Sequence, residues 1–351
     1  MSATYTVGDG KTYATPQAAF AAIVAALSGD ISGQGVHTIE VYAKAAGYAD
    51  GAIDLSTGLV GQSATDYVDV VAMEDHGGMR DAGIVLDIGT TLTNQYILLG
   101  NYTRFHGFCV TGSQWETGGA GWHSIISGRV DFARIYDNIV YDMYCYHGDT
   151  IAAINIWKGG RCYNNQVFHV GADNTAYPTG FGIHIRYGTI GDPVLVHNNT
   201  IVSPSSGSVG VIQDGITIAD GYAHVHNNVV MDTNGLSAAD FVRISVLGTF
   251  EYNVSSDATA GAADGCLSNK VAANQFTSLV AGSEDFRLLV GADCNRNGSD
   301  QSSLFTDDCR GYTRDPAGFN TGAFEYEDYV PAADLDTLIQ PAMLGAIASG
   351  H

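Results

Sequence analysis

Five segments of the 351-residue chain repeat one pattern, in which an apolar residue is followed three positions later by asparagine and then by a further strand-like stretch. They read ARIYDNIVYD, GRCYNNQVFH, VLVHNNTIVS, AHVHNNVVMD and GTFEYNVSSD, with the asparagine at Asn138, Asn165, Asn199, Asn228 and Asn253. The intervals between these asparagines run from 25 to 34 residues. A repeat of that length indicates a solenoid, in which each turn buries its apolar face only against its neighbours.

The repeat also predicts a register. The apolar residues three positions before each asparagine should stack as one interior column; they are Ile135, Cys162, Val196, Val225 and Phe250. Equivalent residues of successive turns lie one strand spacing apart, roughly 4.8 Å. At that distance, asparagine amides can hydrogen-bond along the stack at a bend that tolerates left-handed backbone. We therefore interpret the asparagine row as structural and not catalytic.

A second set of strands lies between the asparagine segments, in AAINIWK, FGIHIRY, DGITIAD and FVRISVL. Apolar residues alternate there with one predicted outward-facing row, formed by Asn155, His184, Thr217 and Arg243. The intervals in this row approximately match those of the asparagine row. Because the two registers agree, the sequence predicts an all-β fold, a single right-handed parallel β-helix solenoid.

Two regions flank the predicted solenoid of residues 35–327. Residues 1–34 contain an N-terminal strand and a helix over 15–28. The helix has Thr15 as N-cap and apolar residues at helical spacing, and it should cap the first turn. Residues 328–351 form a short C-terminal tail rich in Ala and Leu, which is costly to leave exposed. We expect the tail to cap the solenoid or to contact another copy of the chain or a virion protein.

The charge balance limits the partners of the chain. Net charge is −22, from 37 acidic against 15 basic residues, so the surface should repel nucleic acid and anionic membranes. The same field opposes polyanionic sugars, unless a bound cation or a local basic patch reverses it. The sequence has no signal-peptide pattern and no 18-residue apolar stretch. We expect neither nucleic acid nor membrane as a partner.

One group of basic and aromatic residues could bind or process a sugar polymer. A polysaccharide lyase needs a cation or Arg to neutralise a uronate and a base to take the proton at C5. Lys158, His184, Arg186 and Tyr187 are the catalytic candidates for such a reaction. The predicted glycan-binding set is Trp157, Lys158, His184, Arg186 and Arg243. The alternative is an ordinary solvated ladder of polar side chains.

A possible calcium loop lies near the end of the predicted solenoid. Asp293, Asn295, Asn297 and Asp300 spell D-x-N-x-N-G-x-D, whose alternating oxygens resemble the first half of a calcium loop. The twelfth position is Leu304, so the usual bidentate acid is missing. A plain turn is the alternative. No cofactor is otherwise required, and Ca²⁺ is the metal that this pattern suggests.

Three parts of the sequence resemble right-handed parallel β-helix (pectate-lyase-like) repeat proteins of the bacterial and phage type. They are the asparagine repeats, the opening TYTVGDGKTYATPQAAFAAI, and a terminal stretch with matching Asp308, Gly311, Arg314, Gly322, Ala323, Phe324, Glu325 and Tyr326. The resemblance covers roughly residues 4–327 and implies the fold, but its members include lyases, hydrolases, adhesins and virion proteins. Such tails usually carry facing aliphatic residues where this chain has Cys294 and Cys309. We predict a disulfide between them, with a buried thiol pair as the alternative.

These observations favour a non-catalytic structural or adhesive β-helix. We expect a phage virion surface protein, such as a decoration protein, fibre or spike, that contacts glycans. Its expected location is the virion surface or the extracellular space, without a signal peptide. The alternative is a secreted polysaccharide lyase acting on a uronic-acid polymer.

Overall fold

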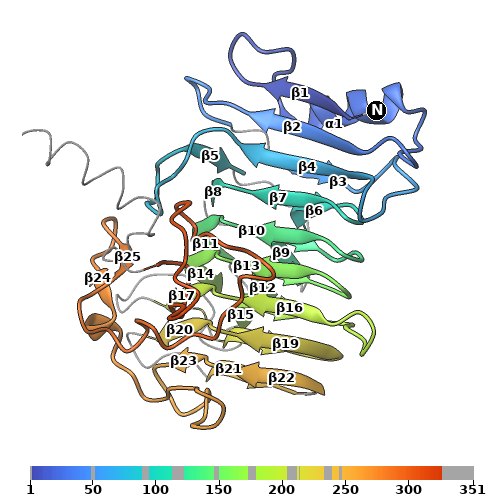
Figure 1. Cartoon of the computed structure of the whole chain (residues 1–351). Helices are drawn as coiled ribbons and strands as arrows, with labels where there is room; N and C mark the ends of the chain where they lie inside the picture. The colour runs from blue at the N-terminus through green and yellow to red at the C-terminus, as the bar shows by residue number, and fades with distance from the viewer. Residues whose placement is uncertain are drawn as a thin grey trace, which may run out of the picture.

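A computed structural model describes residues 2–48, 52–88, 95–112, 122–145, 150–172, 179–203, 212, 214–232, 239–244 and 247–325. Within these residues the chain forms parallel strands stacked from one end of the molecule to the other (Figure 1). The predicted right-handed parallel β-helix solenoid is therefore confirmed. None of the helices in these ranges is long and apolar enough to span a bilayer.

The stacked strands form three parallel sheets. Sheet I contains β1 (Ala3–Val7), β2 (Val36–Val41), β4 (Tyr67–Ala72), β7 (Arg104–His106), β10 (Arg134–Tyr136), β13 (Arg161–Tyr163), β16 (Val194–His197), β19 (Tyr222–His226) and β22 (Leu247–Glu251). Sheet II contains β5 (Ile84–Asp87), β8 (Phe108–Thr111), β11 (Ile139–Cys145), β14 (Gln166–Ala172), β17 (Thr200–Ser203), β20 (Val229–Asp232) and β23 (Val254–Ser255). Sheet III contains β3 (Ile53–Leu55), β6 (Gln95–Leu99), β9 (Trp122–Gly128), β12 (Thr150–Ile156), β15 (Thr179–Ile185), β18 (Asp214–Ile218) and β21 (Ala239–Arg243).

The asparagine row turns the chain from sheet I into sheet II. The interior column predicted before it is in register, because Ile135 pairs with Cys162, and the column continues through the next three turns. All five asparagines are fully buried. The amide Nδ2 of each of the first four donates to Oδ1 of the next asparagine at 3.0 Å. The ladder ends where the backbone N–H of Asn253 donates to Sγ of Cys266 at 3.4 Å.

The predicted N-terminal helix is confirmed as α1 (Pro16–Ala26). The hydroxyl of Thr15 accepts a hydrogen bond from the backbone N–H of Ala18 at 3.1 Å, which satisfies one of the free donors of the first turn. Phe20 and Ile23 are buried against the first strands. The helix therefore covers the apolar end that an uncapped solenoid would expose.

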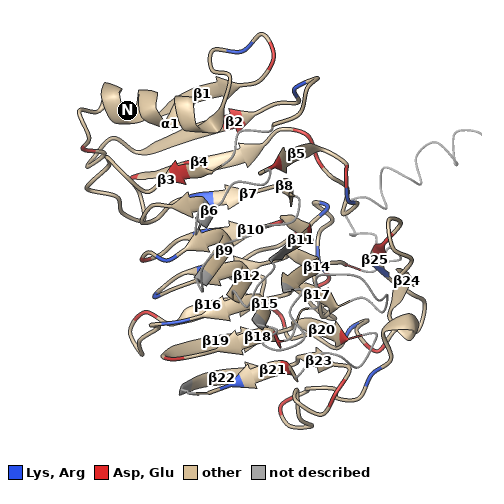
Figure 2. Cartoon of the chain, turned by 180° about the vertical axis from the view of Figure 1, so that it is seen from behind, with Lys and Arg blue, Asp and Glu red and all other residues tan. Residues whose placement is uncertain are grey.

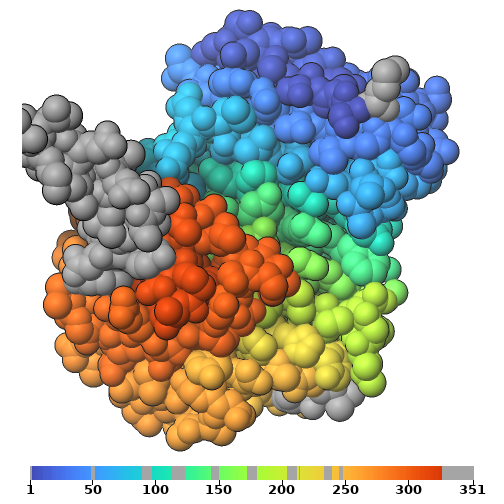
Figure 3. Space-filling model, viewed as in Figure 1, coloured from blue at the N-terminus to red at the C-terminus, as the bar shows by residue number. Residues whose placement is uncertain are grey.

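After β23 the chain leaves the stack. Residues 256–325, here called the returning segment, run back along sheet II, as the orange and red part of Figure 1 shows. They contain η1 (Ala272–Asn274) and the antiparallel pair β24 (Phe276–Ser278) and β25 (Asp285–Leu288). The predicted solenoid range of 35–327 therefore contains two kinds of structure. The space-filling view shows the returning segment covering the flank of the stacked turns (Figure 3).

A second asparagine row fastens the returning segment. The residue before each ladder asparagine has a left-handed backbone, and Asn164, Asn198 and Asn227 have φ between +53° and +57°. Their side-chain amides each donate at 2.8 Å to a backbone carbonyl of the returning segment, at Asp307, Asn320 and Ser299 respectively. The corner thus holds one asparagine row inward, for the ladder, and one outward, for the returning segment.

The terminal stretch that begins at Asp308 also helps to attach the returning segment to the stacked turns. Both carboxylate oxygens of Asp308 accept backbone N–H groups, from Arg310, Tyr312 and Glu325. The fully buried guanidinium of Arg314 donates to Oδ1 of Asn164 at 2.9 Å and to the carbonyl of Gly322 at 3.0 Å. These residues of the motif are therefore structural.

The disulfide prediction is wrong in this structure. Cys294 and Cys309 are both buried free thiols. The backbone of both residues also bonds to residues 321–323: the Cys294 carbonyl accepts from Thr321 N, and Cys309 N donates to the Ala323 carbonyl. Burial raises the pKa of both thiols well above the usual value, so they stay protonated.

Candidate functional site

The basic and aromatic residues predicted as a site gather where sheet III passes into sheet I. Trp157 and Lys158 follow β12, while Arg186 and Tyr187 follow β15 one turn later. The two turns are aligned, because Arg186 N donates to the Ile156 carbonyl at 3.1 Å. We call Trp157, Arg186 and Tyr187, with the supporting Asp220, the Tyr187 platform.

Asp220 holds the platform in place. Its Oδ2 accepts from the guanidinium of Arg186 at 3.1 Å, and its Oδ1 accepts from the backbone N–H of Tyr187 at 2.6 Å. Arg186 lies over the Tyr187 ring at 4.7 Å, and Trp157 meets the same ring edge-on at 4.7 Å. The Tyr187 backbone is left-handed, with φ of 60°, and the residue is 46% exposed. The ring is therefore presented to solvent from a fixed support.

Arg129 belongs to this region and was missed by the sequence analysis. Because β9 pairs with β12 so that Gly128 faces Ile156, Arg129 stands one turn before Trp157 in the same position. It donates to the Ser124 hydroxyl at 3.3 Å. Burial, followed by the nearby Arg186, lowers its pKa below the usual arginine value. Aligning the turn that contains Gly128 with the turn that contains Ile156 would have placed Arg129 beside Trp157 from the sequence.

Lys158 points into an acidic pair instead of toward the platform. Its Nζ lies 3.5 Å from a carboxylate oxygen of Asp131 and 3.6 Å from one of Asp192. The two carboxylates hold its ammonium away from the platform, so Lys158 is poorly placed to act there as a general base.

The predicted outward row of sheet III is only partly correct. Asn155, His184 and Thr217 are in register, but Thr217 pairs with Val242, and Arg243 pairs with Ile218. The row is buried, although an outward row was expected to be solvated, and His184 is 2% exposed. Burial, followed by Arg186 and Arg129, lowers the pKa of His184 to about 4.

Arg243 therefore lies apart from the rest of the predicted glycan-binding set. Its guanidinium stacks over the ring of Phe250 at 4.5 Å, near the last turn of the solenoid. The arginine was assigned to the row by approximate interval alone, and a register difference of one residue moves a side chain to the other face of a strand.

The predicted calcium ligands serve separate contacts. The Asp293 carboxylate accepts from Nζ of Lys270 at 2.8 Å and from the Gln275 amide at 2.9 Å, and these bonds, Lys270 first, lower its pKa. Asn297 donates to the Gly265 carbonyl at 3.2 Å. Asp300 accepts from the backbone N–H of Ser302. Among the described residues no group of three or more His, Cys, Asp or Glu side chains could hold a metal.

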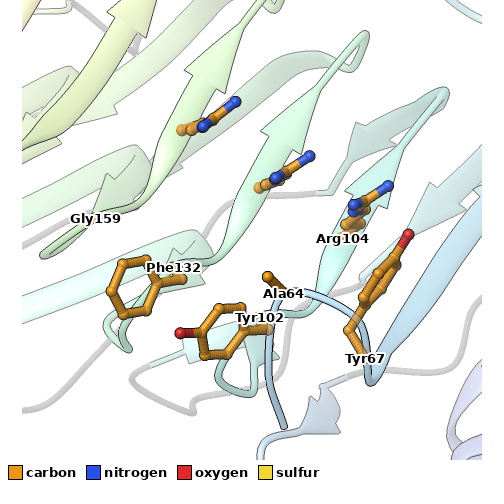
Figure 4. Close-up of a pocket in the computed structure, with 8 residues that line it drawn as sticks. Ala64, Tyr67, Tyr102, Arg104, Phe132 and Gly159 are labelled. Atoms are coloured by element: carbon orange, nitrogen blue, oxygen red, sulfur yellow. The ribbon is translucent and has the colours of Figure 1, made fainter. Parts of the chain in front are cut away.

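A further surface feature, absent from the sequence analysis, lies on the outer face of sheet I. Arg104, Arg134 and Arg161 occupy equivalent positions on β7, β10 and β13, and we call them the arginine ladder. With Tyr67, Tyr102 and Phe132 they line a shallow pocket of about 200 Å³. Figure 4 shows Tyr102 and Phe132 side by side, with Arg104 next to Tyr67. The arginine ladder is thus a basic and aromatic surface distinct from the Tyr187 platform.

Comparison of the chain with models of protein families, with curated proteins and with solved structures found no match. The class of protein therefore comes from the fold alone, which is a parallel β-solenoid with an internal asparagine ladder.

Proposed function

We propose that this protein is a non-catalytic, adhesive β-solenoid that holds carbohydrate at the Tyr187 platform. The observation that carries the proposal is the half-exposed Tyr187 ring, braced by Trp157 and Arg186 and fixed by Asp220. A rigid aromatic ring offers an apolar face at low conformational cost, while its hydroxyl and the neighbouring guanidinium can hydrogen-bond to sugar hydroxyls. A sugar ring has the matching apolar and polar surfaces.

The arrangement of three of the four lyase candidates supports binding over catalysis, while the fourth, Tyr187, is the exposed ring of the platform. His184 is neutral at physiological pH, as a base must be, but it is almost fully buried. Lys158 is paired with two carboxylates and Arg186 with one. A general base must reach the proton that it abstracts, within about 3 Å or through one water. Binding through the exposed platform needs no such access.

We propose further that the protein acts on the surface of a virion or outside the cell, and that residues 328–351 join it to another copy or to a virion protein. The acidic composition supports an exposed, repulsive surface outside the binding site. The tail itself lies outside the described residues. Capsid or tail genes beside this gene are the expected finding, whereas sugar-transport genes would favour the lyase.

Affinity electrophoresis through gels that contain soluble polysaccharides tests the binding proposal. The wild-type protein should be retarded by at least one glycan, and Tyr187→Ala should migrate as it does without glycan. Tyr312→Ala is a matched control, because Tyr312 is 55% exposed and also lies beneath an arginine, Arg310, at 4.5 Å. Equal losses in both variants would contradict the platform. Release of unsaturated sugars from a uronan, seen as an absorbance increase, would replace the proposal with the lyase.

A further inference from the structure

The arginine ladder places three like charges side by side. Arg104 pairs with Arg134, and Arg134 pairs with Arg161, so their Cα positions follow each other at the strand spacing of roughly 4.8 Å. Like charges directly opposite one another destabilise a sheet. Burial lowers the pKa of Arg134, and the two neighbouring arginines lower it further. Holding this ladder together therefore costs the fold stability.

No carboxylate in the described part of the chain forms a salt bridge with the ladder. Eight of the fifteen Lys and Arg residues contact a carboxylate there, but none of these eight belongs to the ladder. The adjacent rung carries Asp69, in register with Arg104, yet Oδ1 of Asp69 lies 3.1 Å from Nε2 of His106. The chain has 37 acidic residues and a negative net charge, so the three arginines create a local patch of the opposite charge.

Aromatic rings form the walls beside the ladder. The Arg104 guanidinium lies 3.9 Å from the centre of the Tyr67 ring. Tyr102 and Phe132 stack on each other with ring centres 4.7 Å apart and planes at 17°. The pocket of about 200 Å³ is smaller than the roughly 300 to 1,000 Å³ of sites for drug-sized ligands. Its size fits one small group and not a folded segment of a polymer.

We propose that the arginine ladder binds a compact oxyanion, either a carboxylate or a sulfate or phosphate monoester, carried by a sugar ring that lies against Tyr102 and Phe132. Guanidinium groups present forked donors that match the oxygens of such anions. The aromatic stack takes the apolar face of the ring. This inference rests on the proposed function only in naming carbohydrate as the carrier. The negative charge outside the pocket disfavours a long polyanion such as nucleic acid.

Calorimetric titration with glucose 6-sulfate, glucose and inorganic sulfate tests the ladder. We expect the sugar sulfate to bind, more tightly than sulfate and with no comparable signal from glucose. Arg134→Gln should weaken binding by about tenfold or more, because it removes a charged hydrogen-bond donor. Arg243→Gln is the matched control: Arg243 also stacks on an aromatic ring and has no carboxylate partner among the described residues, and its loss should leave the affinity unchanged.

The unliganded variant gives a second readout. Arg134→Gln relieves repulsion, so without ligand its melting temperature should equal or exceed that of the wild type, while the rise caused by glucose 6-sulfate disappears. A lower melting temperature would mean that Arg134 is a structural residue, and it would overturn the proposal. Failure of the wild type to bind glucose 6-sulfate, or equal weakening by Arg243→Gln, would overturn it too.

Titrations with the different ligands distinguish a sugar site from a simple anion site and from a nucleic-acid site. Equal affinity for sulfate and glucose 6-sulfate would overturn the role of the sugar, and tighter Arg134-dependent binding of oligo(dT) would replace carbohydrate with nucleic acid. If Tyr187→Ala abolishes retardation by polysaccharide and the wild type does not bind glucose 6-sulfate, the proposed function is supported and the ladder site is overturned. If the sugar sulfate binds through Arg134 and no polysaccharide retards the protein, the reverse holds.

Discussion

Replacing Asp137 by asparagine should stabilise the protein, by an amount that grows with pH. Asp137 occupies the first position of the outward row whose later members are Asn164, Asn198 and Asn227. Those asparagines donate to carbonyls of the returning segment, which a carboxylate cannot do. Oδ1 of Asp137 is buried and has no hydrogen-bond partner among the described residues. The position therefore favours a neutral side chain.

The magnitude follows from the pKa of Asp137. Burial, as the largest cause, raises it to about 8, whereas an aspartate in an unfolded chain titrates at about 3.9. Between these values the folded protein keeps a proton that the unfolded chain releases, so stability falls by at most about 1.36 kcal/mol per pH unit. At pH 7 the ceiling of this loss is about 4 kcal/mol. Asparagine does not titrate, so Asp137→Asn should gain almost nothing below about pH 4 and about 2 to 4 kcal/mol at pH 7.

Urea unfolding of wild type and variant from pH 4 to pH 8 measures this difference. Asn198→Asp is the opposite control: Asn198 is fully buried and donates to the carbonyls of Asn320 and Gly322, so the aspartate should destabilise the fold increasingly as pH rises. A stability difference between Asp137→Asn and wild type that is the same at every pH would refute the reasoning. It would mean that Asp137 is not protonated in the folded protein near neutral pH.

Three further predictions concern the corner, the returning segment and the thiols. Asn199→Leu should lower the free energy of unfolding by about 3 kcal/mol or more in urea titrations, because it leaves buried polar groups on two turns without their hydrogen-bond partner. An equal effect of Ser302→Ala, on an exposed turn, would contradict this. Arg80→Gln leaves the buried Glu284 without its guanidinium, so hydrogen exchange of residues 256–325 should accelerate while that of α1 stays unchanged. Cys294 and Cys309 should react with a thiol reagent only after unfolding, which mass spectrometry can follow; labelling of the native protein at either residue would show that the burial is incomplete.

The asparagine ladder could be predicted because its chemistry forces a fixed offset. An amide that bonds both up the stack and to the local backbone must follow the interior residue at the same distance on every turn, so the row is visible even though the intervals vary. The described residues of sheet III show no such amide ladder with a fixed local bond. Its alternation assigns residues to a face, but it fixed neither the register at Arg243 nor what covers His184.

Two members of the arginine ladder, Arg134 and Arg161, were present in the aligned asparagine repeats, and Arg104 lies one turn before them. Arg104, Arg134 and Arg161 each immediately precede an interior residue, Phe105, Ile135 and Cys162, so the register puts them on neighbouring strands. Whether an acidic residue neutralises them depends on side-chain directions, which the sequence does not give. The returning segment was assigned to the solenoid for a similar reason: its turns follow contacts with distant residues and have no period of their own.

The outward asparagine row changes how the molecule should come apart. In an ordinary solenoid each repeat interacts only with its neighbours, so turns can fray one by one from an end. Here residues 299, 307 and 320 hold three successive turns at once, through contacts that span 72 to 143 positions in the chain. These turns should melt as one cooperative unit. During synthesis that unit cannot close until residues 299–320 have been made.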